Sequence, residues 1–286
     1  MQIAALTVVN ALMLSSLYIL VALGFALMLS IMGIFNFAHG SIYMAGAFVT
    51  YAVAVAFGVQ QWLALVISMV VMGAFGIFLE RFCLRPFGTK GLNVIVMSIA
   101  ITLILENAVS LTLGGSVRQS PPFIPGNFNL GTASIPVGKG IAFVIGLVCL
   151  AAMTLFIHKT RKGQQMLAIA QDREGAALQG ININRTAALA TVIACILATL
   201  SGSFMASIFT LDPYMGDDML FVAVQIVILS GIGSIGGILV GGLIIGCMHA
   251  ILPVVVTPLL AEAITICVLI VILLIRPKGL FGYDIL

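Results

Sequence analysis

The polar side chains best suited to bind a solute lie inside stretches that are otherwise apolar. Residues 31–48 read "IMGIFNFAHGSIYMAGAF" and hold an amide, an imidazole and a hydroxyl on Asn36, His39 and Ser41. Such a cluster is tolerated inside a bilayer if the helix breaks there, so that the freed backbone faces protein or water instead of lipid. Asn36 is then a donor and an acceptor, Gly40 lets the chain turn, and Ser41 can cap the helix that follows. We expect these four residues to line a conduit for a solute.

Two questions about this cluster stay open at the level of sequence. His39 either keeps a neutral ring bonded to a backbone carbonyl, which holds the break closed, or contacts the solute or a gate directly. The break itself lies either near the middle of the membrane or at its inner mouth, because the apolar run before it is long enough to cross completely.

Glu106 is a second candidate for solute chemistry. It lies within "SIAITLILENAVSLTLGG", a segment long enough to span a bilayer. A carboxylate at the bilayer centre costs about 2.5–3.5 kcal/mol, so we expect Glu106 to face the interior of a helix bundle. There it either borders the conduit or bonds to Asn107 or Asn93. The five cysteines are scattered singly without the spacing of metal ligands, so we expect packing residues and no metal site.

Helices that cross a membrane must position these residues. Hydrophobic residues make up 62% of the 286 positions and charged residues 7%, whereas an ordinary soluble domain is about one quarter charged. The apolar runs are too long for barrel strands and do not alternate, which predicts helices. We expect a single all-α polytopic membrane domain over residues 1–286, with about eight or nine transmembrane helices and at least one broken or re-entrant segment. The expected spans are 7–32, 41–57, 61–79, 92–113, 140–157, 187–211, 219–233, 237–253 and 258–275.

Basic residues predict the orientation. All of them except Arg118 and Lys139 fall in three segments, which we expect to face the cytoplasm. These segments contain Arg81, Arg85 and Lys90; Lys159, Arg161, Lys162, Arg173 and Arg185; and Arg276 and Lys278. The first span lacks the basic region and cleavage site of a signal peptide, so we expect it to be retained. The loop 114–140, rich in proline and glycine, then lies outside, and we expect the acidic turn 212–218 beside it.

The longest inner segment, 158–185, reads "HKTRKGQQMLAIAQDREGAALQGININR" and is too short for a catalytic domain. Its apolar residues recur roughly at helical spacing, at Met166, Ile169, Ala170, Ala177 and Ile181. Asp172 can cap a helix that starts at Arg173, and Gly180 suits a left-handed exit from it. The segment therefore forms either interfacial helices on anionic lipid or a docking element for a cytoplasmic partner.

Four motifs resemble one transporter family. "QQMLAIAQDREGAALQGI" resembles the "RAxAxDxxxAxLxGI" coupling segment of LivH-type branched-chain amino acid permeases, with Gln165 and Met166 where that family often has an arginine and an alanine. "FNFAHGSIYMAGAF" is similar to its "xNFAHGxxxMxGAY", "IRPKGLFG" to its "LRPxGLFG", and "GIGSIGGILVGGLIIG" to its glycine-rich helix pair. The motifs occur in order from Phe35 to Gly282, so the resemblance spans nearly the whole chain.

The resemblance implies a non-enzymatic permease subunit of an ABC importer in the bacterial inner membrane, which forms the pathway for hydrophobic amino acids. Its implied partners are a second, LivM-like permease, two ATPases that bind ATP and Mg²⁺, and a periplasmic substrate-binding protein, with membrane lipid around it and no nucleic acid. It implies that the segment 158–185 couples to the ATPases, through Ala170, Asp172, Ala177, Gly180 and Ile181. We expect no cofactor on this chain, because the sequence has no G-x-x-x-x-G-K-[ST] motif to hold the phosphates of ATP.

The glycine-rich segment predicts packing. "GIGSIG" satisfies G-x-G-x-x-G, but no soluble strand and helix surround it, which argues against dinucleotide binding. Gly233, Gly237 and Gly241 lie four residues apart, as do Gly242 and Gly246, and this spacing lets helices approach closely in lipid.

Three alternatives remain at this stage. Permeases similar to this family serve urea, short amides or aromatic acids, and the binding protein often decides between substrates. A secondary transporter or channel that works alone is the alternative from another class. A membrane enzyme is the third and least favoured alternative, because no convergent cluster of His, Asp and Glu or of Ser, His and Asp supports it.

Overall fold

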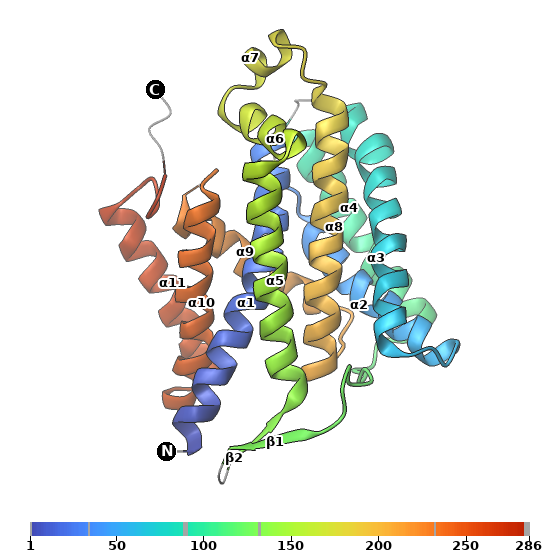
Figure 1. The fold of residues 1–286 in the computed structure, drawn as a ribbon, viewed down its shortest axis with the longest axis vertical. Helices are drawn as coiled ribbons and strands as arrows, with labels where there is room; N and C mark the ends of the chain where they lie inside the picture. The colour runs from blue at the N-terminus through green and yellow to red at the C-terminus, as the bar shows by residue number, and fades with distance from the viewer. Residues whose placement is uncertain (1, 34, 88–90, 131–132, 232, 283–286) are drawn as a thin grey trace.

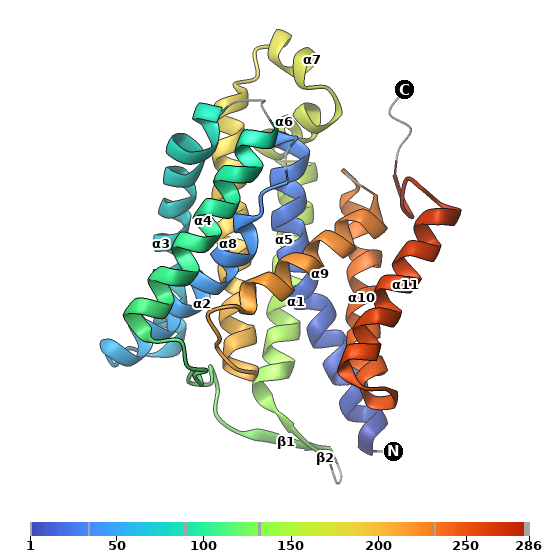
Figure 2. The same cartoon turned by 180° about the vertical axis from the view of Figure 1, so that it is seen from behind.

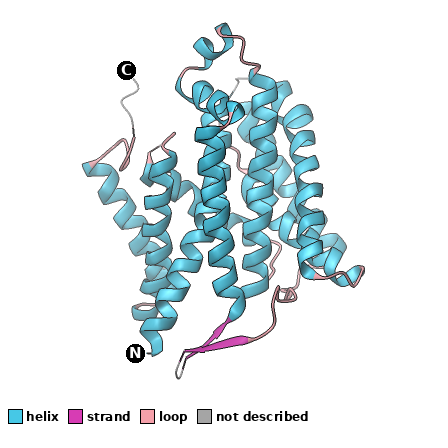
Figure 3. Cartoon of the chain, viewed as in Figure 1, coloured by secondary structure: helices cyan, strands magenta, loops and turns pink. Residues whose placement is uncertain are grey.

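The chain folds as a bundle of long helices with one small β-hairpin at an end (Figures 1 and 3). The structure, a computed structural model, describes residues 2–33, 35–87, 91–130, 133–231 and 233–282. Within these ranges, eight helices are long and apolar enough to cross a membrane. The prediction of an all-α polytopic membrane protein is confirmed, with the lower of the two expected counts.

The elements follow the predicted spans closely. The long helices are α1 (Gln2–Met32), α2 (Ala38–Ala56), α3 (Gln61–Phe78), α4 (Gly91–Leu113), α5 (Val137–Lys159), α8 (Ile183–Ile208), α10 (Ile235–Val255) and α11 (Pro258–Ile275). The shorter ones are η1 (Leu79–Leu84), η2 (Arg85–Phe87), α6 (Arg161–Gln171), α7 (Arg173–Leu178) and α9 (Met215–Ser230). Strands β1 (Asn127–Leu130) and β2 (Ala133–Pro136) pair antiparallel, with Phe128 opposite Ile135.

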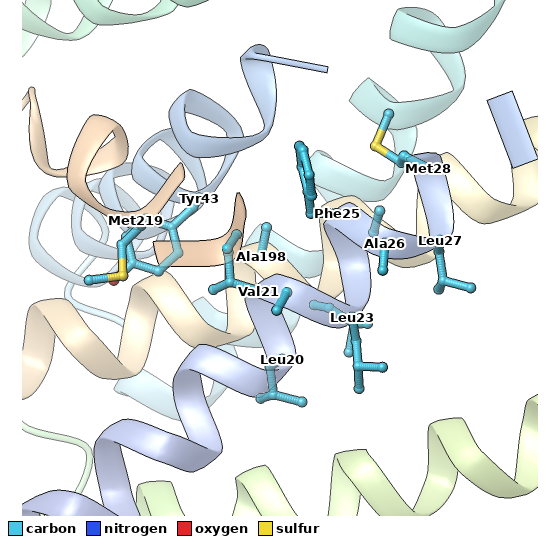
Figure 4. Close-up of a cluster of buried hydrophobic side chains, with 14 of the residues drawn as sticks. Leu20, Val21, Leu23, Phe25, Ala26, Leu27, Met28, Tyr43, Ala198 and Met219 are labelled. Carbon is cyan, nitrogen blue, oxygen red and sulfur yellow. The ribbon is translucent and has the colours of Figure 1, made fainter. Parts of the chain in front are cut away.

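Helix α1 is the centre of the bundle. Of its apolar window, 94% is buried, against 17–39% for α3, α4, α5, α10 and α11, whose outer faces are free to contact lipid. Leu20, Val21 and Leu23 belong to one core together with Ala198 of α8 and Met219 of α9 (Figure 4). A helix that is apolar on all sides is stable only when it is enclosed by other helices, as α1 is, or when it faces lipid.

Small residues allow the helices around α1 to pack closely. Gly246 and Gly242 of α10 face Ser15 and Ile19 of α1, where any added Cβ would overlap with those side chains. Gly237 and Gly241 face Ser230 at the end of α9. These four therefore lie at helix contacts of the kind that small residues permit in lipid. Gly233 is not at such a close contact: its φ is +88° and an added Cβ would meet no atom within 4 Å, so it serves the turn between α9 and α10 instead.

The described basic segments lie at one end of the bundle, which we call the basic end. Figure 1 shows the end of α3, helices α6 and α7, and the C-terminal segment together at the top, with the N-terminus and the hairpin at the opposite end. This arrangement agrees with the expected common orientation. Lys90, which was assigned to the first basic segment, lies outside the described residues.

An ion pair between a buried carboxylate and an exposed guanidinium braces the basic end. Glu80, with a side chain 2% exposed, accepts hydrogen bonds from Nε and Nη2 of Arg85 at 3.0 and 2.6 Å. Nη2 also lies 3.4 Å from the carbonyl oxygen of Asn184, at the start of α8. The pair therefore connects the end of α3 to the helix that follows α7.

Replacing Arg85 with methionine should lower the free energy of unfolding by about 1–3 kcal/mol, because the buried Glu80 carboxylate loses its partner. The double variant Glu80→Met with Arg85→Met should recover most of that loss, since no buried charge is left unpaired. Fluorescence of the single tryptophan, Trp62, follows thermal unfolding in detergent. The exposed Arg81→Met is the control, and an Arg85→Met midpoint equal to wild type would contradict the bracing role.

Candidate functional site

Helix α2 begins in the middle of the bundle. Nε2 of His39, in its first turn, lies 3.1 Å from the carbonyl oxygen of Val21 on α1. Val21 lies eleven residues before Met32, where α1 ends at the basic end, and eleven residues of helix rise about 16 Å, half the thickness of a hydrocarbon core. The chain after α1 therefore returns into the bundle before α2 starts. Of the two positions left open by sequence, this depth favours the one near mid-membrane.

Helix α9 begins at the same depth from the other direction. Helix α8 ends far from the basic end, where Leu211 exchanges two backbone hydrogen bonds of 2.9 Å with Arg118. The chain then turns back, and α9 runs obliquely from the middle of the bundle to the basic end (Figure 2). With 16 residues α9 is a half-helix, so the prediction of a complete span at 219–233 is wrong. The expectation that the whole acidic turn 212–218 joins the outer loop is also wrong, because Asp217 and Asp218 lie in the first turn of α9.

The two half-helices meet at glycine on both sides. A Cβ on Gly216 would lie 2.5 Å from the carbonyl oxygen of Gly40 and 3.1 Å from the backbone nitrogen of Ser41, and a Cβ on Gly40 would overlap with the carbonyl group of Gly216. The backbones of α2 and α9 are thus in direct contact at their N-terminal ends. Because each helix N-terminus carries a partial positive charge, this junction concentrates positive potential inside the membrane.

Asn36, His39 and Gly40 make contacts within the protein at the break. Oδ1 of Asn36 accepts from the backbone nitrogen of Ala38 at 3.1 Å, and its Nδ2 lies 3.5 Å from the sulfur of Met28. His39 is fully buried. Its ring contacts the carbonyl of Val21, which is the first of the two roles considered for it. Helix α2 begins at Ala38 and Ser41 lies inside it, so the capping role predicted for Ser41 is wrong.

Ser41 and Glu106 come together with a residue that the sequence reasoning did not select. The Glu106 carboxylate on α4 lies near Ser41 on α2 and is coupled electrostatically to the carboxylate of Asp217 on α9. Glu106 is 6% exposed and Ser41 1% exposed, and neither Oε1 of Glu106 nor Oγ of Ser41 has a hydrogen-bond partner. We call Ser41, Glu106 and Asp217 the acidic junction. Asn107, considered as a partner, turns to the carbonyl of Leu103 instead.

The acidic junction was hard to find from sequence. Asp217 stands next to Gly216 in "YMGDD", and that glycine is the one local sign that the carboxylate lies beside another backbone. Among the described residues, no group of three or more His, Cys, Asp or Glu is placed to hold a metal ion. The junction offers two carboxylates and one hydroxyl, a donor set better suited to a nitrogen cation or a proton than to a transition metal.

The segment 158–185 forms two short helices at the basic end, as predicted. Oδ1 of Asp172 accepts from the backbone nitrogens of Glu174 and Gly175, each at 3.0 Å, and caps α7. Gly180 leaves α7 with φ of +81°, and the bonds from Gly180 to Ala177 and from Ile181 to Ala176 close a Schellman motif. The predicted cap and exit are confirmed.

The exposed face of these helices is apolar in part. Met166 and Ile169 are buried against the bundle, Ile181 is half-buried, and Ala170 and Ala177 are exposed. Leu178, which the sequence analysis did not single out, is 89% exposed. This leucine, held at the tip of a capped helix, is available for contact with another protein.

Comparison with known proteins gives a consistent result over the whole chain. Residues 7–273 match the model of a family described as "Branched-chain amino acid transport system / permease component". The chain is 32% identical over 288 residues to the high-affinity branched-chain amino acid transport system permease protein LivH of Escherichia coli (strain K12), which covers 96% of this chain and 94% of the relative. It is also 32% identical over 290 residues to the corresponding protein BraD of Pseudomonas aeruginosa, with the same coverage.

A solved structure shares the fold. PsaBC from Streptococcus pneumoniae in complex with Fab superposes with a TM-score of 0.53 at 15% identity, over 94% of this chain and 91% of that chain. At this level of identity the likeness concerns the arrangement of helices alone.

Proposed function

This chain belongs to the family of branched-chain amino acid transport system permease components, and from that premise we propose that it carries branched-chain, hydrophobic amino acids across the bacterial inner membrane. The observation that carries the proposal is the match along 96% of the chain to relatives named for that transport. The two half-helices that meet at mid-membrane support it, because transporters commonly build their solute sites where helices are interrupted. Ser41 and Glu106 border the pathway in this proposal, while Asn36, His39 and Gly40 keep its shape.

A second permease subunit, LivM-like, pairs with this chain in the proposed importer. The support comes from Asp217 and Asp218, whose side chains are exposed near mid-membrane on the isolated chain. Exposed carboxylates at that depth are costly in lipid, by about 2.5–3.5 kcal/mol each on insertion scales. The face of α9 is therefore covered by water or by another subunit, as a pathway between two permeases requires.

Two cytoplasmic ATPases, which bind ATP and Mg²⁺, dock on α6 and α7 in this proposal. The segment is rigid where docking needs rigidity, through the cap at Asp172 and the glycine exit at Gly180. Ala170 and Ala177 present a shallow apolar surface, and Leu178 projects from it. Ile181 packs against the bundle side and carries movement of the ATPases into α8. A periplasmic binding protein delivers the substrate at the opposite end.

Purification of the chain with its native partners tests this proposal. We expect two ATPase copies and a second permease to co-purify, and the cognate binding protein to be stabilised against heat by leucine, isoleucine or valine. Reconstituted into liposomes, the complex should take up radiolabelled leucine only with ATP inside and binding protein outside. Stabilisation of the binding protein by urea, an amide or an aromatic acid alone would change the substrate class. Leucine flux by the chain without ATPases would favour a transporter that works alone.

A further inference from the structure

We propose that the acidic junction binds the α-ammonium group of the transported amino acid at mid-membrane, with Glu106 and Asp217 as its carboxylate ligands and Ser41 as its hydroxyl ligand. The inference rests on the proposed function, because it needs a substrate that carries an amine. It goes beyond the proposed function by naming the residues that bind the substrate directly, and it includes Asp217 among them.

The unsatisfied polar atoms are the first support. Oγ of Ser41 and Oε1 of Glu106 are buried without a hydrogen-bond partner, on helices α2 and α4 that converge at the junction. A buried polar group without a partner is costly, so natural proteins leave few of them outside functional sites. An ammonium group has three donors and no acceptor, and the junction offers acceptors from three different helices.

The charge balance is the second support. The carboxylates of Glu106 on α4 and Asp217 in the first turn of α9 are coupled to each other electrostatically. Among the described residues, Glu80 at the basic end is the one carboxylate in an ion pair, so neither Glu106 nor Asp217 has a basic partner there. Two neighbouring carboxylates repel each other when both are ionised, and a cation between them removes that repulsion. The positive N-terminal ends of α2 and α9 offset the repulsion between the two ionised carboxylates only in part, because a helix terminus carries about half an elementary charge.

Accessibility is the third support. Asp217 is exposed, whereas Glu106 and Ser41 are buried behind it, so the junction opens toward the face that the proposed second permease covers. A substrate that passes between the two permeases reaches Asp217 first and then the unpartnered atoms. The apolar side chain of a branched-chain amino acid has Leu220 of α9 near the same junction to contact, because the Cβ of Leu220 lies 2.9 Å from the position of an added Cβ on Gly40.

Uptake by the complete importer in liposomes tests the site. Asp217→Asn and Glu106→Gln should each lower the initial rate of radiolabelled leucine uptake at least about tenfold, because each removes a charged partner of the ammonium. ATP hydrolysis stimulated by the binding protein should fall by no more than about threefold, since docking and delivery are untouched. Asp217→Glu, which keeps the charge, should recover a substantial part of the uptake.

Asp218→Asn is the matched control. Asp218 shares the first turn of α9 and the same favourable interaction with its helix end, but its electrostatic neighbours are Tyr18, Tyr43 and Asp217 instead of Glu106. It should retain most of the uptake. If Asp218→Asn lowers uptake as much as Asp217→Asn, the carboxylates serve the stability of α9 and the proposal is overturned.

Two further outcomes would overturn the site. Wild-type uptake by both Asp217→Asn and Glu106→Gln would show that no ammonium is bound there. Loss of the second permease from the purified Asp217→Asn complex would show that Asp217 pairs with a basic side chain of that subunit and not with the ammonium group of the substrate. Failure of the wild-type importer itself to take up any branched-chain amino acid is a different result, because it would refute the proposed substrate and the ammonium site together.

Discussion

ATP-driven uptake should fall at least about 30-fold when Leu178 is replaced with aspartate, because the change puts a charge at the centre of the proposed ATPase contact. Leu178 is 89% exposed at the end of α7, so the substitution removes no packing within the chain itself. The variant should insert and pair with the second permease normally. The measurement is the amount of ATPase that co-purifies with the chain, together with leucine uptake in liposomes.

Ser134→Asp is the control for added charge. Ser134 is exposed on β2, at the opposite end of the bundle, where no cytoplasmic subunit can reach it. It should keep full ATPase association. The docking role of Leu178 is refuted if Leu178→Asp retains bound ATPase and stimulated hydrolysis while uptake is lost, because the defect would then lie in the pathway.

Replacing Gly40 with valine should prevent correct assembly of the two half-helices, with a loss of stability of about 3 kcal/mol or more. Any Cβ at Gly40 overlaps with the carbonyl group of Gly216, and backbone cannot move aside as a flexible side chain can. A branched side chain also meets Leu220, whose Cβ lies 2.9 Å from the position of an added Cβ. We expect little monodisperse protein, a lower midpoint of thermal unfolding followed at Trp62, and no uptake.

Gly73→Ala is the matched control in a buried helix. An added Cβ at Gly73 meets Cδ1 of Ile196 at 3.5 Å, which is an ordinary van der Waals distance. This variant should fold at least as well as wild type, since alanine favours a helix over glycine by about 0.5–1 kcal/mol. Normal folding and uptake by Gly40→Val would show that α2 and α9 do not cross as closely as described here.

Local physical chemistry made much of this protein predictable from its sequence. Hydropathy over about 20 residues decides which segments enter lipid, and basic residues decide their orientation, so the spans and the common basic end could be predicted. The helices of the segment 158–185 could also be predicted, because their ends depend on local interactions. A cap at Asp172 and a glycine exit at Gly180 depend on atoms within a few residues of each other.

Only the tertiary structure decided how the site is built. Hydropathy reports that a segment is apolar but not how deep it begins, so α9 was predicted as a full span although it starts at mid-membrane. Asn36 and His39 were predicted to face a conduit, yet the contacts that occupy them come from α1 and from the start of α2. Polarity at membrane depth signals that a group needs a partner, but it does not say whether that partner is protein or solute.

The acidic junction is the clearest case of a feature that the fold creates. Ser41, Glu106 and Asp217 are far apart along the chain and belong to three helices, so no spacing or periodicity relates them. Ser41 and Asp217 meet because Gly40 and Gly216 let two backbones touch, which brings the first turn of α9 against the first turn of α2, and Glu106 joins them from α4. Sequence predicted that Ser41 and Glu106 lie within the membrane but assigned Asp217 to an outer turn, and the packing of glycine on glycine determined that Asp217 lies against Ser41.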